Sequence, residues 1–420
     1  MDAGSSASPV LHYTAGFVNI TPTRPIPLAG HLGRTDPYAG VADDLEANVV
    51  ILRDGAQPLV LISFDLLYVG GLLRRKLEQS LQSCVQPERL FLAASHTHFA
   101  PATDSTFSRP ELGAVDPDYL ATVIATVSSL VRDLLQGEFK PLYAGVGQAQ
   151  ADNAVNRRYA GWRITRRYPF VRKVVQMRPN PSGVKDETVR VLRFGSEAVI
   201  WNYACHPVFT PQMNHVSADF VGVARKSLRK KLGAKTAVLF WQGFSGDVYP
   251  SFAATMVGLT AKLKRKVFGT NGAVTPEVWQ RWAERLAGHV LSASDRAVLR
   301  AITGPIRSQR SSCSLADLMD DATTDKVVGT HRISIGSDLQ ILGISAECVT
   351  EYGEVCRNAL KNENLFCVGC IDGVFGYLPT SPMLREGGYE AVDFLPYFSL
   401  QGRFRDQLEQ IVQDKLLAFD

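Results

Sequence analysis

The chain has 420 residues, of which 45% are hydrophobic and 20% are charged, values typical of a folded protein with a large buried core. Its 45 basic and 41 acidic residues leave a formal net charge of only +4, which argues against a nucleic-acid partner, because such proteins concentrate basic residues on one face. No apolar stretch reaches the ~18 residues that a membrane-spanning helix needs, so the sequence predicts no integral membrane segment.

The first half of the chain alternates between predicted strands and helices. Residues 48–53 and 59–64 are expected to form a strand pair, joined by the turn residues Asp54 and Gly55. The elements expected after this pair are a helix at 72–82, a buried strand at 89–94, a helix at 119–135 and a strand at 142–146.

The second half continues this alternation. The expected strands are 189–193, 198–203, 237–241 and 339–344, and the expected helices are 221–232, 279–293 and 348–361. Helices interspersed with hairpins and single strands predict an α/β fold with mixed sheets flanked by helices. We expect one domain over residues 14–420, preceded by a flexible tail of small and polar residues at 1–13. The basic run at 225–231 is interpreted as a solvated helix face.

The cysteines and the N-terminus bear on the cellular compartment. Seven cysteines at irregular spacing argue against a disulfide framework and favour a reducing compartment. Cys367 and Cys370 form a single C-x-x-C pair, which is weak evidence for zinc without a second pair. The first residues lack the basic region and apolar core of a signal peptide, and we therefore expect the protein in the cytoplasm.

Reactive residues collect where buried strands are expected to end. Four such clusters occur, at residues 95–98, 205–206, 243–247 and 346–347. Ligand sites in α/β sheets form just beyond the carboxyl ends of strands. Four clusters of this kind in one chain indicate a shared site.

Metal ligation accounts for the histidines of these clusters. His96 and His98 are two residues apart, which in an extended chain places both imidazoles on one face. His206 follows a different strand, and zinc sites draw their ligands from separate elements. Glu347 can supply an oxygen ligand, since a histidine–carboxylate set with an open position is the catalytic arrangement of zinc. The alternative for Glu347 is a carboxylate that stabilises a helix N-terminus.

Ser245 lies in the turn-rich segment 243–250. It can act as a nucleophile or as a hydrogen-bond donor to a reacting oxygen, and the alternative is a plain tight turn. The segment lacks the G-x-S-x-G pattern of an α/β-hydrolase, so a Ser-His-Asp triad is not supported.

An ordered set of short motifs runs along nearly the whole chain. Its members are Asn19-Ile-Thr-Pro22, Ser63-Phe-Asp-Leu66, Ser95-His-Thr-His-Phe-Ala-Pro101, Asn156-Arg157, Cys205-His-Pro207, Ser217-Ala-Asp219, Phe244-Ser-Gly-Asp-Val-Tyr-Pro250 and Gly376-Tyr-Leu-Pro-Thr380. Over residues 15–394 this set resembles the neutral/alkaline (non-lysosomal) ceramidase family. The order of the motifs, rather than any single one, carries the resemblance.

The resemblance implies a zinc-dependent amidase with one zinc ion per chain. The metal ligands that it implies are His96, His206, Glu347 and Tyr377. The catalytic residues that it implies are Ser245, His98, Arg157 and Tyr389. In this scheme His98 and Arg157 polarise the scissile carbonyl, and Tyr389 lies near the substrate. We expect Arg157 in a loop between strands, where it serves catalysis rather than stability.

Departures from the family pattern bear on the substrate. Phe99-Ala100 replaces the Ser-Gly usual after the His-Thr-His motif, and Pro207-Val208 replaces Gly-Thr after the second metal histidine. The chain is also expected to be a short variant without the family's C-terminal immunoglobulin-like domain. The implied ligands are present while their surroundings differ, so a typical ceramide is not the expected substrate.

The sequence therefore predicts a zinc-dependent hydrolase that cleaves the amide bond of a small or lipid-like N-acyl compound by a metal-activated water. One alternative is the same zinc chemistry on an ester or lactone, or run towards amide formation by a biosynthetic cyclase. A second alternative is a non-catalytic ligand-binding protein on the same fold. The sequence leaves the oligomeric state open.

Overall fold

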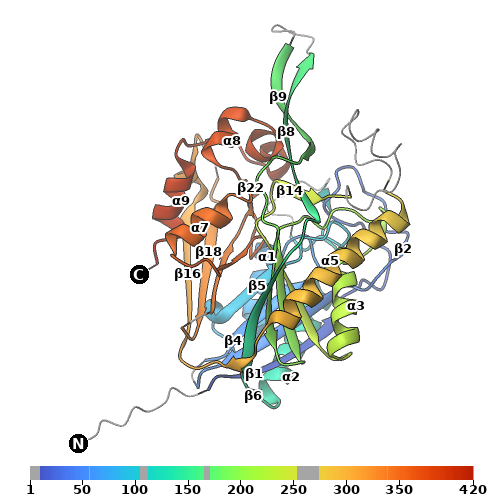
Figure 1. Ribbon diagram of the computed structural model, residues 1–420, viewed down its shortest axis with the longest axis vertical. Coiled ribbons are helices and arrows are strands. Elements are labelled where there is room, and N and C mark those ends of the chain that lie inside the picture. The colour runs from blue at the N-terminus through green and yellow to red at the C-terminus, as the bar shows by residue number, and fades with distance from the viewer. Residues whose placement is uncertain are drawn as a thin grey trace, which may run out of the picture.

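Three larger sheets form the body of the protein, and helices cover their outer faces (Figure 1). The computed structural model describes residues 10–55, 57–104, 112–164, 171–252, 274–322, 324–337 and 339–419. Parallel and antiparallel strand pairs occur within each larger sheet, which confirms the predicted α/β fold with mixed sheets.

The first sheet has the strand order β5-β4-β3-β1-β6. Its strands are β1 (His12–Asn19), β3 (Glu46–Arg53), β4 (Leu59–Phe64), β5 (Leu90–Ala94) and β6 (Lys140–Pro141). Strands β3 and β4 form the predicted antiparallel pair, and β5 lies parallel to β4. Helices α1 (Gly70–Leu81) and α2 (Pro117–Gln136) confirm the predictions at 72–82 and 119–135, and their apolar residues pack on one face of this sheet.

The second sheet has the order β13-β11-β10-β7-β15. Its strands are β7 (Tyr143–Gln150), β10 (Thr188–Phe194), β11 (Ala198–Tyr203), β13 (Ala237–Gln242) and β15 (Arg300–Ala301). Helices α3 (Phe220–Leu232) and α5 (Pro276–Arg296) cover its outer face. Helix α5 begins at Pro276 because the Thr275 side chain caps it by accepting the Val278 amide, and proline fits the first helical position.

The third sheet has the order β16-β18-β19-β21 and lies against the C-terminal helices. Its strands are β16 (Ile306–Ser314), β18 (Val327–Ile335), β19 (Leu339–Ile344) and β21 (Phe366–Val368). The helical segments around it are α6 (Leu315–Leu318), α7 (Tyr352–Ala359), α8 (Ser381–Glu386), α9 (Leu408–Leu416), the π-helical turn η3 (Tyr389–Asp393) and the 3₁₀ turn η4 (Leu395–Phe398).

Smaller strand groups complete the described structure. A three-stranded sheet joins β14 (Val248–Pro250), β8 (Ala154–Ile164) and β9 (Val171–Asn180), and the last two form a long projecting hairpin. Three two-stranded pairs are β2 (Gly40–Val41) with β12 (His215–Val216), β17 (Met319–Asp320) with β23 (Arg403–Phe404), and β20 (Glu347–Cys348) with β22 (Tyr377–Leu378). A short 3₁₀ turn, η1 (Pro87–Arg89), precedes β5.

The central core lies where the three larger sheets meet. Leu52 and Leu61 of the first sheet, Leu239 of the second and Ile341 of the third belong to one buried cluster. Alternate residues of β3 and β4 point instead to the helices α1 and α2, so both faces of these strands are buried. This double burial explains why the strands read as continuous apolar runs in the sequence.

Three features differ from the sequence-based boundaries. Strand β1 begins at His12 and Leu11 is buried, so ordered structure starts inside the segment predicted as a flexible tail; residues 1–9 of that segment lie outside the described residues. Helix α7 begins at Tyr352, because Cys348 belongs to β20. The run 225–231 is not a uniformly solvated face, since Arg225 is buried.

Candidate metal centre

Two loops bring three histidines together. His96 and His98 follow β5, and His206 follows β11, as the strand-end clusters predicted. The amide of His96 donates to the carbonyl of Leu66, and the amide of His98 donates to the carbonyl of Pro207, which joins the loops of the first and second sheets. His96 has a φ of +68°, a left-handed conformation that a non-glycine residue adopts only when its surroundings enforce it.

The three imidazoles offer nitrogens that lie within 4.8 Å of one another. Each ring is fixed by its Nδ1 atom: His96 contacts the carbonyl of Leu67 at 3.0 Å, and His98 contacts that of Gly30 at 2.9 Å. The Nδ1 of His206 contacts the carbonyl of Ser245 at 2.8 Å. A ring that donates through Nδ1 keeps its Nε2 lone pair for another partner.

The Nε2 atoms of His96 and His98 are buried without a hydrogen-bond partner within the described ranges. Buried polar atoms without partners are rare in folded proteins and call for an explanation. Gly30 permits this arrangement, because a Cβ at its position would lie 2.6 Å from the Nδ1 of His98. Residue 30 also has a φ of +94°, which favours glycine.

Glu347 places a carboxylate against two of these rings. Its Oε2 lies 3.1 Å from the Nε2 of His206 and 3.3 Å from that of His96, and its Oε1 accepts a 2.6 Å hydrogen bond from the hydroxyl of Tyr68. Strands β20 and β22 are parallel, with Glu347 opposite Tyr377, so two of the residues predicted as ligands are neighbours in one register. The helix N-terminus alternative for Glu347 does not hold, because it lies in a strand.

Burial and charge set the protonation of the cluster. Burial, together with the charge of Arg157, lowers the pKa of His206 to about 4. Burial and the neighbouring imidazoles hold the pKa of His98 well below its usual range. For His96, burial lowers the pKa, but the Cys370 thiol and the Glu347 carboxylate raise it by more. Two neutral imidazoles beside a buried carboxylate form a donor set suited to a cation.

Arg157 borders the cluster through Tyr377, the residue opposite Glu347. It belongs to strand β8 rather than to a loop, so that prediction was wrong. Its Nη2 donates to the carbonyl of Gly246 at 2.7 Å and to the hydroxyl of Tyr377 at 3.3 Å, and its Nε donates to Glu390 at 2.7 Å. The rings of Tyr377 and Tyr389 are 5.4 Å apart, and the guanidinium lies over both.

Ser245 contacts the site through its backbone. Its carbonyl accepts from the Nδ1 of His206, while its hydroxyl accepts from the side-chain amide of Gln242. Within the described ranges, the recorded partner of this hydroxyl is an amide and not an imidazole. The neighbouring Gly246 is required by a close approach, because a Cβ there would lie 2.6 Å from the carbonyl oxygen of Glu347.

Three residues contact the predicted site residues without having been assigned to the site from the sequence. Tyr68 follows β4 and contacts Glu347, and the strand-end rule applied to β4 would have indicated it. Glu390 pairs with Arg157, but no local pattern joins residues 233 positions apart. Cys370, part of the C-x-x-C pair, interacts with His96 and hydrogen bonds through its backbone to Ala94. All seven cysteines are free, in agreement with the predicted absence of disulfides.

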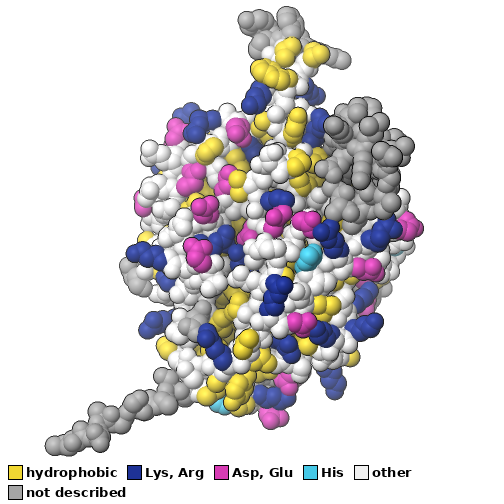
Figure 2. Space-filling model, viewed as in Figure 1, with side chains coloured by type: hydrophobic (Ala, Val, Ile, Leu, Met, Phe, Trp, Pro, Cys, Tyr) yellow, Lys and Arg dark blue, Asp and Glu magenta, His cyan; other side chains and the backbone are white. Residues whose placement is uncertain are grey.

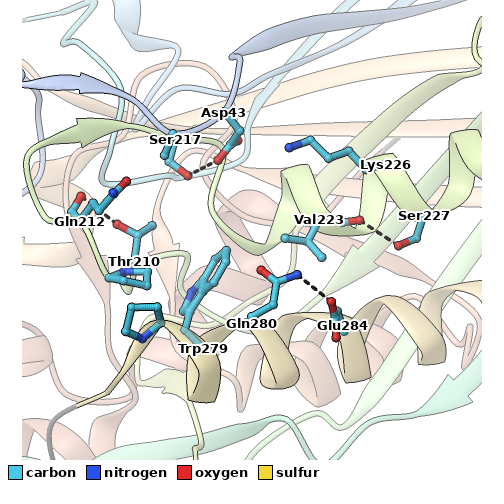
Figure 3. Close-up of a pocket in the computed structure, with 13 residues that line it drawn as sticks. Asp43, Thr210, Gln212, Ser217, Val223, Lys226, Ser227, Trp279, Gln280 and Glu284 are labelled. Atoms are coloured by element: carbon cyan, nitrogen blue, oxygen red, sulfur yellow. Dashed lines mark hydrogen bonds between the residues drawn. The ribbon is translucent and has the colours of Figure 1, made fainter.

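A surface pocket lies behind the histidine loop. Asp43, Ser217, Lys226 and Trp279 are among the residues that line it (Figure 3). Ser217 donates to Asp43 at 2.6 Å, and its backbone carbonyl accepts from the hydroxyl of Thr97, which lies between His96 and His98. The Ser217-Ala-Asp219 motif therefore supports the loop that holds the imidazoles.

Comparison with known proteins bears on the fold. No family model and no curated protein matches the sequence. Among solved structures, the chain is similar to the neutral ceramidase from Pseudomonas aeruginosa, with a TM-score of 0.72 and 14% identity over 96% of this chain and 73% of that chain. The chain has the fold of the neutral ceramidases. A structure described as a ceramidase complexed with C2 gives a TM-score of 0.71 at 13% identity, over 96% of this chain and 74% of that one. None of the described helices is long and apolar enough to cross a membrane.

Proposed function

We propose that the protein is a zinc-dependent hydrolase that cleaves the amide bond of a small or lipid-like N-acyl compound. The observation that carries this proposal is the convergence of three Nδ1-anchored imidazoles, two of which contact one buried carboxylate, on the fold of the neutral ceramidases. Imidazole nitrogen and carboxylate oxygen are the ligands of catalytic zinc sites, and carbonyl acceptors at the second nitrogen are the usual support of such ligands.

The contacts of Glu347 distinguish the proposed zinc ligands from His98. The carboxylate of Glu347 touches His96 and His206, and its register partner is Tyr377. We therefore assign His96, His206, Glu347 and Tyr377 as the ligands of one zinc ion, and His98 as a group that faces the substrate. Zinc bound here would lower the pKa of a water molecule to about 7 and polarise the substrate carbonyl.

Arg157 supplies positive charge on the tyrosine side of the site. Coulombic contact with Tyr377 and Glu390 holds the pKa of this buried guanidinium above its usual value, against the effect of burial. The group therefore stays charged while an oxyanion develops at the scissile carbonyl, and one such preorganised donor contributes about 3 kcal/mol. His98 is a neutral ring whose Nδ1 donates to Gly30, so its Nε2 lone pair can accept a proton on the substrate side, in place of the polarising role that the resemblance implied. We assign to Tyr389 the delivery of a proton to the leaving nitrogen.

Ser245 positions groups in this scheme rather than attacking the substrate. A nucleophilic serine needs an adjacent base, and the recorded partner of its hydroxyl among the described residues is the Gln242 amide. Ser245→Ala retains the carbonyl that orients His206, so zinc should remain bound and turnover should fall by no more than about 10²–10³. An acyl group trapped on Ser245, detected by mass spectrometry in a single turnover, would show that the serine is the nucleophile.

A substrate panel tests the proposal. N-acyl amines, matched esters and lactones are offered to the purified protein, to chelated protein and to chelated protein with zinc restored. We expect amide hydrolysis that chelation abolishes and zinc restores, and that His206→Ala lacks. Turnover confined to esters or lactones would show that the protein is an esterase or lactonase rather than an amidase. Metal-loaded protein that binds N-acyl compounds without turnover would identify a ligand-binding protein.

A further inference from the structure

The hairpin of β8 and β9 projects beyond the body of the molecule (Figure 1). Its antiparallel register runs from Arg158 opposite Met177 to Ile164 opposite Val171. Large apolar side chains along it are exposed, among them Trp162 at 73% and Ile164 at 83%. A two-stranded ribbon has no core of its own, so exposed apolar residues on a projecting ribbon indicate a contact outside this chain.

The two faces of the hairpin differ in chemistry. Residues opposite each other on paired strands lie on the same face, and successive residues alternate between faces. One face carries the pairs Ile164–Val171, Trp162–Lys173, Ala160–Val175 and Arg158–Met177, and the other carries Arg163–Arg172, Gly161–Val174 and Tyr159–Gln176. The first face is therefore mainly apolar with two basic residues among its members, and the second is distinguished by two arginines directly opposite each other. Two arginines directly opposite each other destabilise the ribbon unless an anion neutralises them.

The charge of the hairpin is entirely positive. Its described residues, 154–164 and 171–180, include six Lys or Arg and no Asp or Glu, a local charge of +6 in a chain whose total is +4. Arg157 and Arg158, at its base, pair with Glu390. The outer four are Arg163, Arg172, Lys173 and Arg178, and no ion pair to another described residue is recorded for them. Figure 2 shows hydrophobic and basic side chains together on this projection.

The apolar face continues to the candidate metal centre. Val175 lies on that face, and a Cβ at Gly388 would come within 2.9 Å of the Val175 Cβ. Gly388 directly precedes Tyr389, and Arg157 lies in β8 at the base of the hairpin. The described strands thus run from beside the proposed site to the exposed residues Ile164 and Val171.

We propose that this hairpin docks the protein on an anionic lipid surface, with Trp162 and Ile164 entering the headgroup region and the outer arginines contacting lipid phosphates. Tryptophan favours the membrane–water interface, and each basic residue near an anionic membrane adds about 1 kcal/mol. Long basic side chains can bury their stems in the interface while their charges reach the headgroups. A nucleic acid would satisfy the basic face but leave the apolar one exposed, which is why the lipid surface fits better.

The tryptophans make the docking directly measurable. Trp162 is exposed, whereas the other four, Trp201, Trp241, Trp279 and Trp282, are at most 9% exposed. Vesicles of phosphatidylcholine with 30% phosphatidylglycerol should therefore shift the Trp162 emission to the blue, and spin-labelled lipid should quench it. Trp162→Phe should abolish both changes while the protein still sediments with the vesicles. Sedimentation of the wild type without quenching of Trp162 would contradict the proposal.

Charge reversal tests the basic face against a matched control. Arg163→Glu with Arg172→Glu should weaken partitioning onto anionic vesicles at least about thirtyfold, the effect of two lost contacts of about 1 kcal/mol each. Lys230→Glu with Lys235→Glu makes the same charge change at exposed positions away from the hairpin and should leave partitioning within about threefold. Equal losses in both double variants would show that only the net charge matters, and would overturn the proposal.

The apolar face has its own matched pair. Ile164→Ser should weaken partitioning about fivefold, whereas Val298→Ser, at a position that is 81% exposed, should not change it. No binding of the wild type to anionic vesicles would sink the docking surface. If the protein retains single-stranded DNA but does not bind vesicles, the hairpin binds a nucleic acid instead of a lipid surface. If the protein is a dimer that Trp162→Ser separates, the hairpin binds a second copy of the chain.

Docking deepens the proposed function when the substrate is lipid-like, and this link rests on the proposed function. The binding measurements need no turnover and can be repeated on His206→Ala, so failure of docking and failure of the amidase chemistry are distinguishable. With both correct, Arg163→Glu/Arg172→Glu should lower hydrolysis of a vesicle-borne N-acyl lipid at least tenfold and leave hydrolysis of a short water-soluble analogue unchanged.

Discussion

Two buried networks of arginines and carboxylates differ in how their charges balance. Near the metal centre, Glu390 pairs with both Arg157, at 2.7 Å, and Arg158, at 2.9 Å, and Arg158 also pairs with the half-exposed Glu386 at 3.2 Å. Beneath helix α3, the two arginines Arg225 and Arg229 face two carboxylates. These carboxylates are Glu46, which lies 2.6 Å from Arg229, and Asp65, which pairs with Arg225.

The balance indicates what each network does. In the second network each charge has a partner, so it needs no ligand and braces α3 against the first sheet. In the first network the two arginines share one buried carboxylate, because Glu386 is 54% exposed and its pairing is screened by solvent. This leaves an excess of buried positive charge where Arg157 contacts Tyr377. A buried charge that is only partly compensated is costly unless something else neutralises it. We read the excess as charge held for an oxyanion or phenolate in the site.

Arg157→Ala should have the largest effect of the changes that test this contrast. Glu390 keeps Arg158 as a partner, so the unfolding free energy should fall by only about 1–2 kcal/mol. Turnover on an N-acyl substrate should fall by about 10²–10³, the effect of losing one oxyanion donor. Steady-state kinetics and chemical denaturation measure the two quantities; unchanged kinetics with a large loss of stability would make Arg157 a structural residue.

Arg225→Met should show the opposite division. Removal of one partner from a balanced buried network leaves the charge of Asp65 unpaired, and the unfolding free energy should fall by about 3 kcal/mol. Turnover per zinc-loaded, folded molecule should remain within about twofold of the wild type, because no atom of this network contacts the proposed ligands. A tenfold loss of turnover at full zinc occupancy would mean that the two networks are coupled.

Asp65→Asn should produce the change most restricted in range, confined to the pH dependence of stability. Burial raises the pKa of Asp65 to about 6 although Arg225 lowers it, so between pH 4 and 6 the folded state holds a proton that the unfolded state releases. The stability that this group contributes is complete below pH 4 and is lost as the pH rises through 6, by about 3 kcal/mol. Denaturation of wild type and variant across this range measures the difference, which should shrink by that amount; a constant difference would contradict the raised pKa.

The sequence predicted the elements and the histidine cluster because both leave local patterns. Strands β3 and β4 are buried on both faces and read as apolar runs, and polar residues directly after buried strands mark His96 and His206. Arg225 was misjudged as part of a solvated run, although it lies four residues after Val221 and three before Leu228, on the buried face of α3. The helical spacing of Arg225 relative to these apolar residues, rather than its charge, indicates that its side chain is buried.

Other parts of the site leave no local pattern. Tyr68 and Glu347 are in contact across 279 residues, and Arg157 meets Glu390 across 233. Tyr377 and Tyr389 came from the family resemblance alone, because a buried tyrosine looks the same in sequence whether it fills a core or faces a metal. The pairing of strands β20 and β22 places Tyr377 beside Glu347. This pairing is a tertiary contact, and it cannot be predicted from composition or periodicity.

The metal content of the purified protein tests the central claim most directly. Elemental analysis should find one zinc ion per wild-type chain and none in the His96→Ala/His206→Ala double variant, since that variant removes two of the four proposed ligands. The control, His12→Ala with His289→Ala, changes two histidines outside the site and should keep the full zinc content. No zinc in the wild type, or full zinc in the His96→Ala/His206→Ala variant, would contradict the account.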